Sequence, residues 1–143
     1  MKKDILHIGI TGTRSGLSEY QYAEVIKFLN SAFEPGAVFH HGDCIGVDVE
    51  VAWVAKELGY KIVGHPPMKK ELRGYFDDDE TMPAKNYFAR NRDIVNESFV
   101  LMVVPWQMEH QDNGGTWYTH DYADKNDKPL VIFWPEEKNE KGA

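Results

Sequence analysis

Short apolar segments alternate with amphipathic ones along the chain. Residues 5–10 are apolar, rich in β-branched side chains and only partly alternating, which is typical of a strand buried on both faces. Four later apolar segments have a similar length and lie between turn-forming residues. The pattern predicts five strands, at residues 5–10, 37–40, 60–64, 99–104 and 129–134.

The segments between the predicted strands have a helical repeat. Apolar residues recur at three- and four-residue spacings, and Ser18 with Gln21 forms a candidate capping box at the start of the first repeat. These patterns predict helices at residues 17–32, 46–58, 84–96 and 116–125.

Regular alternation of strands and helices is typical of an α/β fold with a parallel sheet covered on both faces. We predict a Rossmann-like three-layer sandwich whose mainly parallel, five-stranded sheet has the order 3-2-1-4-5. Residues 1–135 form one nucleotide-binding domain in this prediction, and residues 136–143 form a flexible tail. Residues 66–83 are polar and too long for an ordinary connection, so we expect a binding loop, a lid or a partly disordered segment there.

Composition narrows the class of protein. The chain has 143 residues, 42% of them hydrophobic, and its apolar runs are too short to span a bilayer. Its one cysteine and the lack of a signal-peptide pattern favour the cytoplasm. A formal charge of −7 disfavours broad electrostatic attachment to DNA or to an anionic membrane.

The loop after the first predicted strand carries glycine, hydroxyl and guanidinium groups. Glycine lets the backbone approach an anion, and an arginine binds two phosphate oxygens at once. The sequence matches neither the dinucleotide-binding nor the P-loop pattern. We interpret the loop as a phosphate site or, alternatively, as a tight turn with an exposed arginine; the candidate residues are Gly12, Thr13, Arg14 and Ser15.

A second glycine-containing loop follows the second predicted strand. Within it, Gly42 and Asp43 are candidate ligand contacts, and Asp43 has the chemistry to accept ribose hydroxyls. Asp48 either joins them or caps backbone donors in the first turn of the next helix, the interpretation that its position favours. The nearby histidines are interpreted as polar residues at the sheet edge rather than as metal ligands: His40, His41 and His65.

The third glycine turn, Gly114-Gly115-Thr116, precedes the last predicted helix. In the predicted topology it faces the first loop across the point where the strand order reverses. We therefore expect two helix N-termini to converge on one site, an arrangement that suits a phosphorylated ligand.

In combination, these features resemble the SLOG superfamily, Rossmann-like proteins that include DprA, LOG phosphoribohydrolases and nucleotide-sensing domains. The resemblance covers about residues 5–134 and rests on four motifs in order: the Thr-Gly-x-Arg turn, Gly42-x-x-x-Gly46-x-Asp48, Arg90-Asn91-Arg92 and Gly114-Gly115-Thr116. It implies a homo-oligomer and a nucleotide-like ligand. The contacts that it implies are Gly12, Thr13, Arg14, Gly42, Asp48, Arg90, Asn91, Arg92, Gly114, Gly115 and Thr116.

One departure from the family pattern bears on catalysis. LOG-type hydrolases place a glutamate after the glycine turn, whereas this chain has Trp117-Tyr118-Thr119-His120-Asp121 there. Cleavage of an N-glycosidic bond normally needs a carboxylate at that position. Asp112 and Asp121 are the candidate catalytic substitutes, with Glu109 as a further carboxylate in the preceding loop.

Three hypotheses follow. The favoured one is binding, for sensing or sequestration, of a nucleotide or a nucleotide-derived phosphorylated ligand. The second is an N-glycosidase or phosphoribohydrolase that acts on a nucleoside monophosphate. The third is a DprA-like module for single-stranded DNA or for protein interaction, which the acidic charge disfavours. No cofactor, metal or membrane partner is expected.

Overall fold

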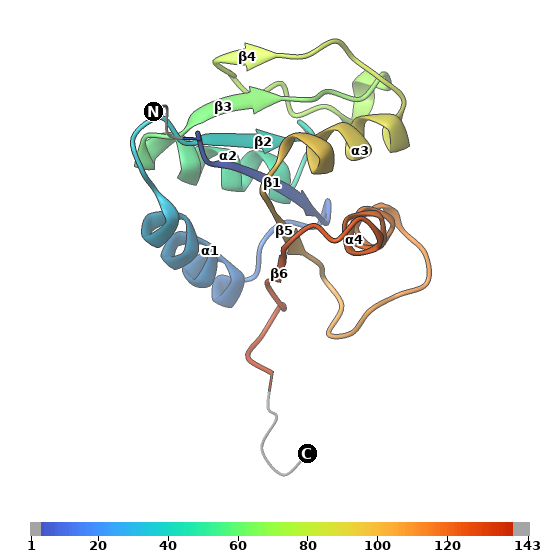
Figure 1. The fold of residues 1–143 in the computed structure, drawn as a ribbon. Helices are drawn as coiled ribbons and strands as arrows, with labels where there is room; N and C mark the ends of the chain where they lie inside the picture. The colour runs from blue at the N-terminus through green and yellow to red at the C-terminus, as the bar shows by residue number, and fades with distance from the viewer. Residues whose placement is uncertain (1–3, 139–143) are drawn as a thin grey trace.

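The protein alternates strands and helices as predicted, and its computed structural model describes residues 4–138 (Figure 1). The strands are β1 (His7–Gly12), β2 (Val38–His41), β3 (Lys61–Gly64), β4 (Glu80–Thr81), β5 (Val100–Val104) and β6 (Leu130–Ile132). The helices are α1 (Glu19–Ala32), α2 (Val47–Leu58), α3 (Tyr87–Glu97) and α4 (Gly115–Lys125), with a short 3₁₀ helix at Lys70–Leu72.

All six strands pair in parallel in one sheet of order β4-β3-β2-β1-β5-β6. The predicted order 3-2-1-4-5 is confirmed, since it corresponds to β3-β2-β1-β5-β6. The predicted count of five strands is wrong by one. The missed strand, β4, has two exposed residues and pairs only with the end of β3, so it leaves no hydrophobic pattern in the sequence.

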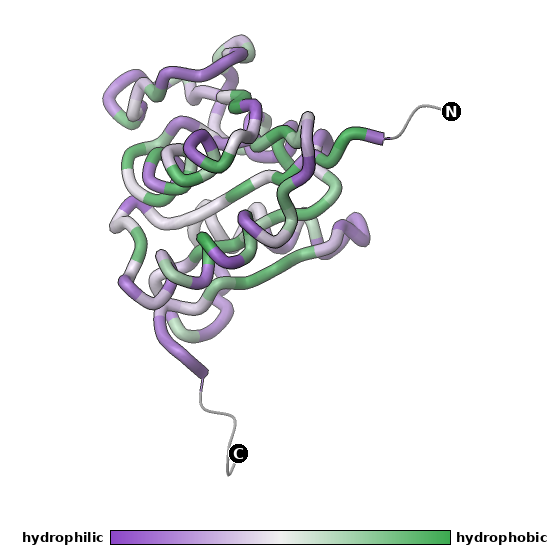
Figure 2. Tube along the Cα trace, turned by 90° about the vertical axis from the view of Figure 1, so that its left-hand side faces the viewer, coloured by the Kyte–Doolittle hydropathy of each residue, from purple (hydrophilic) through white to green (hydrophobic). Residues whose placement is uncertain are grey.

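Helices cover both faces of the sheet, which confirms the three-layer arrangement. On one face, α1 and α2 pack over a core that includes Val25, Val51 and Phe39; on the other, α3 and α4 bury Ile94 and Trp117. The hydropathy of the trace follows this arrangement, with hydrophobic strands inside and hydrophilic loops outside (Figure 2). Within residues 4–138, no helix is long and apolar enough to cross a membrane.

Residues 66–83 are ordered and pack against the sheet edge, so the alternative of a partly disordered segment is wrong. Asp43 anchors the segment because its carboxylate accepts from Arg73 Nε and from the Phe76 amide, both at 2.9 Å. Phe76 is buried with the α1–α2 core, and Asp78 lies 2.6 Å from His41. Most of the predicted flexible tail, residues 139–143, lies outside the described residues.

A buried glutamine joins α1 to the far end of the sheet. Gln21 Nε2 donates to the carbonyl oxygens of Pro105 and Phe133, at 2.7 and 2.8 Å. Its Oε1 accepts from the Ser18 amide, which completes the predicted capping box. One side chain therefore holds both the start of α1 and the loop after β5.

We expect Gln21→Ala to lower the free energy of unfolding by about 2–4 kcal/mol, because two buried carbonyls lose their donor and the cap is weakened. Urea denaturation measures this loss. Gln111→Ala is the control, since the Gln111 amide donates only to Glu109 within the same loop. Equal stability of the two variants would show that the carbonyl bonds contribute nothing measurable.

Candidate ligand-binding site

The turn after β1 is held rigidly by backbone contacts. The Thr13 amide donates to the Val104 carbonyl and the Thr13 carbonyl accepts from the Val47 amide, both at 3.1 Å. A Cβ atom added at Gly12 would lie 2.5 Å from the Val47 side chain. The turn is thus fixed between the end of β5 and the start of α2.

Gly46 explains the glycine spacing of the second loop. Its φ is +103°, and an added Cβ atom would lie 2.5 Å from the Arg14 carbonyl oxygen. Only glycine fits this conformation and this approach without strain. Gly46 therefore lets the start of α2 pack closely against the turn after β1, so its role is to shape the site.

The N-terminus of α4 has no side-chain cap. Its N-cap, Gly114, has φ of +97° and has no side chain to cap the helix. The first amides of a helix have no acceptor within the helix, and the helix dipole places partial positive charge there. These amides are available to an anion.

The first and third turns meet over one hollow of about 280 Å³ at the carboxyl ends of β1 and β5. Arg14 supplies its cationic side chain, and Trp106, whose residue surface is 64% exposed, supplies an aromatic one. We call this feature the glycine-turn hollow. It is lined by Gly12, Thr13, Arg14, Tyr87, Trp106, Gln107, Asn113, Gly114, Gly115, Thr116 and Trp117.

Among the described residues, those at the start of α1 do not line the hollow, so the expected convergence of the α1 and α4 N-termini is wrong. The Ser18 hydroxyl accepts from the Gln21 amide at the start of α1 and donates to the Pro135 carbonyl. Neither Ser18 nor Ser15 is among the residues that line the glycine-turn hollow. The amide of Ser15 instead donates to Thr13 Oγ1 at 3.1 Å, within the turn.

The predicted contacts of the second loop form a buried network behind the hollow. Asp48 accepts from the Gly42 and Cys44 amides at 3.1 and 3.2 Å, so its donors lie in the preceding loop and not in the first helical turn. Arg90 donates to the Gly42 carbonyl and, at 3.0 Å, to the His65 carbonyl. Burial raises the pKa of Asp48, which the Arg90 charge opposes. Like Asp43, these groups already have protein partners.

Asn91 differs from its neighbours in this network. Its Oδ1 accepts from Arg90 Nε at 2.7 Å, but its buried Nδ2 has no acceptor among the described residues. Asn91 lines a cavity of about 10 Å³, close to the volume that one water needs, beside Gly12 and Arg14. The third residue of the motif, Arg92, donates to the Tyr118 hydroxyl and so joins α3 to α4.

The two predicted catalytic carboxylates lie in a neighbouring hollow of about 570 Å³, beside the α4 turn. Asp121 accepts hydrogen bonds from His110 and His120 at 2.7 and 2.8 Å. Partial burial would raise the pKa of Asp121, but these hydrogen bonds outweigh it and lower the pKa. Asp112 is exposed and lies on the same hollow.

Sequence reasoning missed Tyr87 as part of the site. A Cβ atom added at Gly115 would lie 2.1 Å from the Tyr87 hydroxyl oxygen, so the second glycine of the α4 turn makes room for this ring. Tyr87 starts α3, and nothing in its local sequence indicates that it meets a turn 28 positions away. Gln107 also lines the hollow and was not predicted, whereas Asn113 directly precedes the predicted third glycine turn.

These features define a Rossmann-like α/β protein with a polar hollow at the switch point of its sheet. No protein-family model and no curated protein matches the chain. Solved structures do. The molybdenum cofactor binding protein from Rippkaea orientalis is similar with a TM-score of 0.73 and 20% identity, over 94% of this chain and 80% of that one.

Two further solved structures extend the comparison. The Moco carrier protein from Chlamydomonas reinhardtii has a TM-score of 0.67 and 24% identity, over 91% of this chain and 76% of that one. DNA processing protein A from Helicobacter pylori has a TM-score of 0.61 and 24% identity, over 94% and 67%. The predicted resemblance to the SLOG superfamily is therefore confirmed at the level of the fold.

We expect Gly46→Ala to cost at least about 2 kcal/mol more stability than Gly36→Ala, measured by urea denaturation. Both glycines have positive φ, but an added Cβ atom meets nothing within 4 Å at Gly36. The difference between the variants therefore isolates the contact with the Arg14 backbone. Equal costs would mean that the first turn moves away freely.

Proposed function

We propose that this chain is a cytoplasmic protein that binds a nucleotide or a nucleotide-derived phosphorylated ligand, for sensing or sequestration. The observation that carries the proposal is that Gly12–Arg14 and Gly114–Thr116 line one hollow into which the uncapped start of α4 opens. Backbone amides there bind phosphate oxygens, and Arg14 adds a charge-assisted contact.

The rest of the hollow suits the other parts of such a ligand. Trp106 offers an exposed ring for stacking of a base, while Gln107 and Asn113 offer amides to sugar hydroxyls. The unpartnered Asn91 Nδ2 beneath the first turn is a further donor, to a ligand oxygen or to a bridging water. The hollow thus combines anion, hydroxyl and aromatic contacts.

The structural neighbours support a small-molecule ligand and set the competing possibilities. Two are named for binding or carrying the molybdenum cofactor, and one is described for its single-stranded DNA binding mode. Arg14 is the one cationic residue among the described residues that line the hollow. Single-stranded DNA needs a row of phosphate contacts, so a small ligand is favoured.

The proposal is tested by calorimetry against nucleoside mono-, di- and triphosphates, nucleotide sugars, a cyclic ADP-ribose, the molybdenum cofactor and a single-stranded oligonucleotide. We expect a small phosphorylated compound to bind, and Arg14→Gln to weaken it at least about tenfold through loss of one charge-assisted hydrogen bond.

Lys27→Gln is the matched control, because it removes one positive charge from the exposed surface of α1 and should leave binding unchanged. Failure of every small compound at millimolar concentration would overturn the proposal. Binding of the oligonucleotide alone, weakening steeply with salt, would favour the DNA-binding hypothesis instead.

Binding without hydrolysis is favoured because the carboxylate nearest the expected catalytic position is engaged. Asp121 already accepts hydrogen bonds from two imidazoles, and Asp112 is exposed to solvent. A general acid or base for glycoside cleavage needs a free carboxyl group tuned by its surroundings. The imidazole contacts of Asp121 and the exposure of Asp112 therefore favour binding over cleavage.

We therefore expect no release of free base when the chain is incubated with nucleoside monophosphates and the mixture is separated by chromatography. The double variant Asp112→Asn with Asp121→Asn is the control for any background release. Base release by the wild-type chain that this variant abolishes would establish the N-glycosidase alternative.

A further inference from the structure

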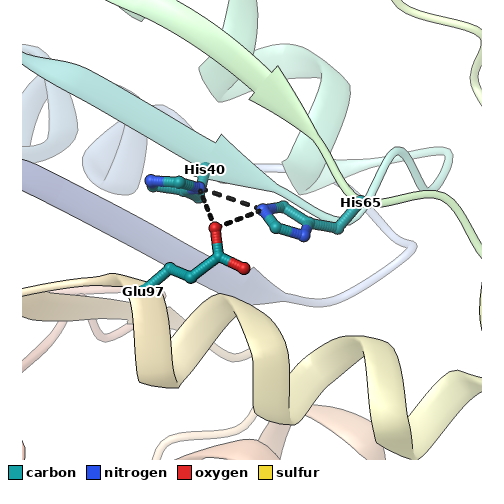
Figure 3. Close-up of side chains that lie close together, drawn as sticks. All are labelled: His40, His65 and Glu97. Atoms are coloured by element: carbon teal, nitrogen blue, oxygen red, sulfur yellow. Dashed lines mark hydrogen bonds and ion pairs between the residues drawn. The ribbon is translucent and has the colours of Figure 1, made fainter. Parts of the chain in front are cut away.

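A second group of polar side chains lies between the sheet and α3. His40 in β2, His65 directly after β3 and Glu97 at the end of α3 point toward one another (Figure 3). The two histidine side chains are 3% exposed, whereas that of Glu97 is 42% exposed. None of the three lines the glycine-turn hollow. His41 is not part of this group, because it bonds to Asp78.

The rings of His40 and His65 lie in a row with a third ring, that of His7. His40 Nδ1 and His65 Nε2 are 2.9 Å apart, and His40 Nε2 lies 2.8 Å from His7 Nδ1. A metal ion binds imidazole through an unprotonated ring nitrogen, so an ion here would replace the hydrogen bond between His40 and His65.

The position of Glu97 is not explained by hydrogen bonding. Its Oε1 lies 3.9 Å from His40 Nδ1 and 4.0 Å from His65 Nε2, too far for a hydrogen bond to either. A point about 2.1 Å from all three atoms lies in the plane that they define, so a tetrahedral ion requires the two histidine nitrogens to move apart slightly. Bonds from zinc to imidazole nitrogen and to carboxylate oxygen are about 2.0–2.2 Å long.

We propose that His40, His65 and Glu97 form a zinc site, with His40 Nδ1, His65 Nε2 and Glu97 Oε1 as ligands. Three protein ligands leave a fourth position for water, which reaches the site past the half-exposed Glu97. His7 contacts the nitrogen of His40 that does not bind the metal, as partners of metal-bound histidines do. The bound ion joins β2, the end of β3 and α3.

Another cluster, His110, His120 and Asp121, also has metal-ligand chemistry, but its geometry is different. Asp121 Oδ1 lies 2.7 and 2.8 Å from the two imidazole nitrogens, so each contact is already a hydrogen bond. His110 and Asp121 are exposed. In this cluster the carboxylate already bonds to both imidazoles, whereas the Glu97 carboxylate bonds to neither of its histidines, so the cluster supplies a control for the proposed site.

The test uses the full chain, freed of metal by chelator dialysis, in a zinc titration at neutral pH with a competing chromophoric chelator. We expect one zinc per chain. Glu97→Gln keeps the shape of the side chain and should weaken zinc binding at least about tenfold, the loss that even a supporting partner of a ligand causes. Zinc should also raise the melting temperature of the wild-type chain and not that of Glu97→Gln.

Two variants are controls. Glu57→Gln makes the same charge change on α2, which covers the opposite face of the sheet, and His120→Gln breaks the second cluster. Both should bind zinc as the wild type does, whereas His65→Gln should not. Absence of zinc binding by the wild-type chain, or binding that survives Glu97→Gln but is lost in His120→Gln, would overturn the proposal.

Discussion

The candidate site depends on the parallel pairing of β1 with β5. Five consecutive residue pairs, ending at Gly12 with Val104, bring the carboxyl ends of these strands together. The Thr13 amide then bonds to the Val104 carbonyl, so the turn after β1 begins where β5 ends. The connections that follow these two strands run toward opposite edges of the sheet, and a crevice forms between them. The start of α4 closes one side of it.

Much of the fold could be predicted because its signals are local. Helical repeats, turn glycines and apolar strands are properties of neighbouring residues, and handed crossovers limit how such units join. The strand β4 could not be predicted, because Glu80 and Thr81 are exposed and are ordered only by pairing with Val63 and Gly64. The order of residues 66–83 depends similarly on Asp43, which lies 30 positions from Arg73.

The candidate site was predictable only in part, for a related reason. Turn glycines indicate a close backbone approach wherever they occur, so Gly12 and Gly115 were identified. Charged residues are ambiguous in a sequence, because an arginine before a strand contacts either a ligand or other parts of the protein. Arg90 does the second, since it donates to carbonyls of the loops after β2 and β3. The capping box of Ser18 and Gln21 already implied that the amides of α1 have partners.

The acidic charge of the chain and the proposed anion site are compatible because different groups set each property. The net charge of −7 comes from side chains spread over the surface, and salt screens their effect beyond about 8–10 Å. The field inside the glycine-turn hollow comes from backbone dipoles at the start of α4 and from Arg14. Such a field acts over one helical turn, so it favours a single phosphate group. A long polyanion would extend beyond this range, and under the proposed function this favours small ligands over nucleic acid.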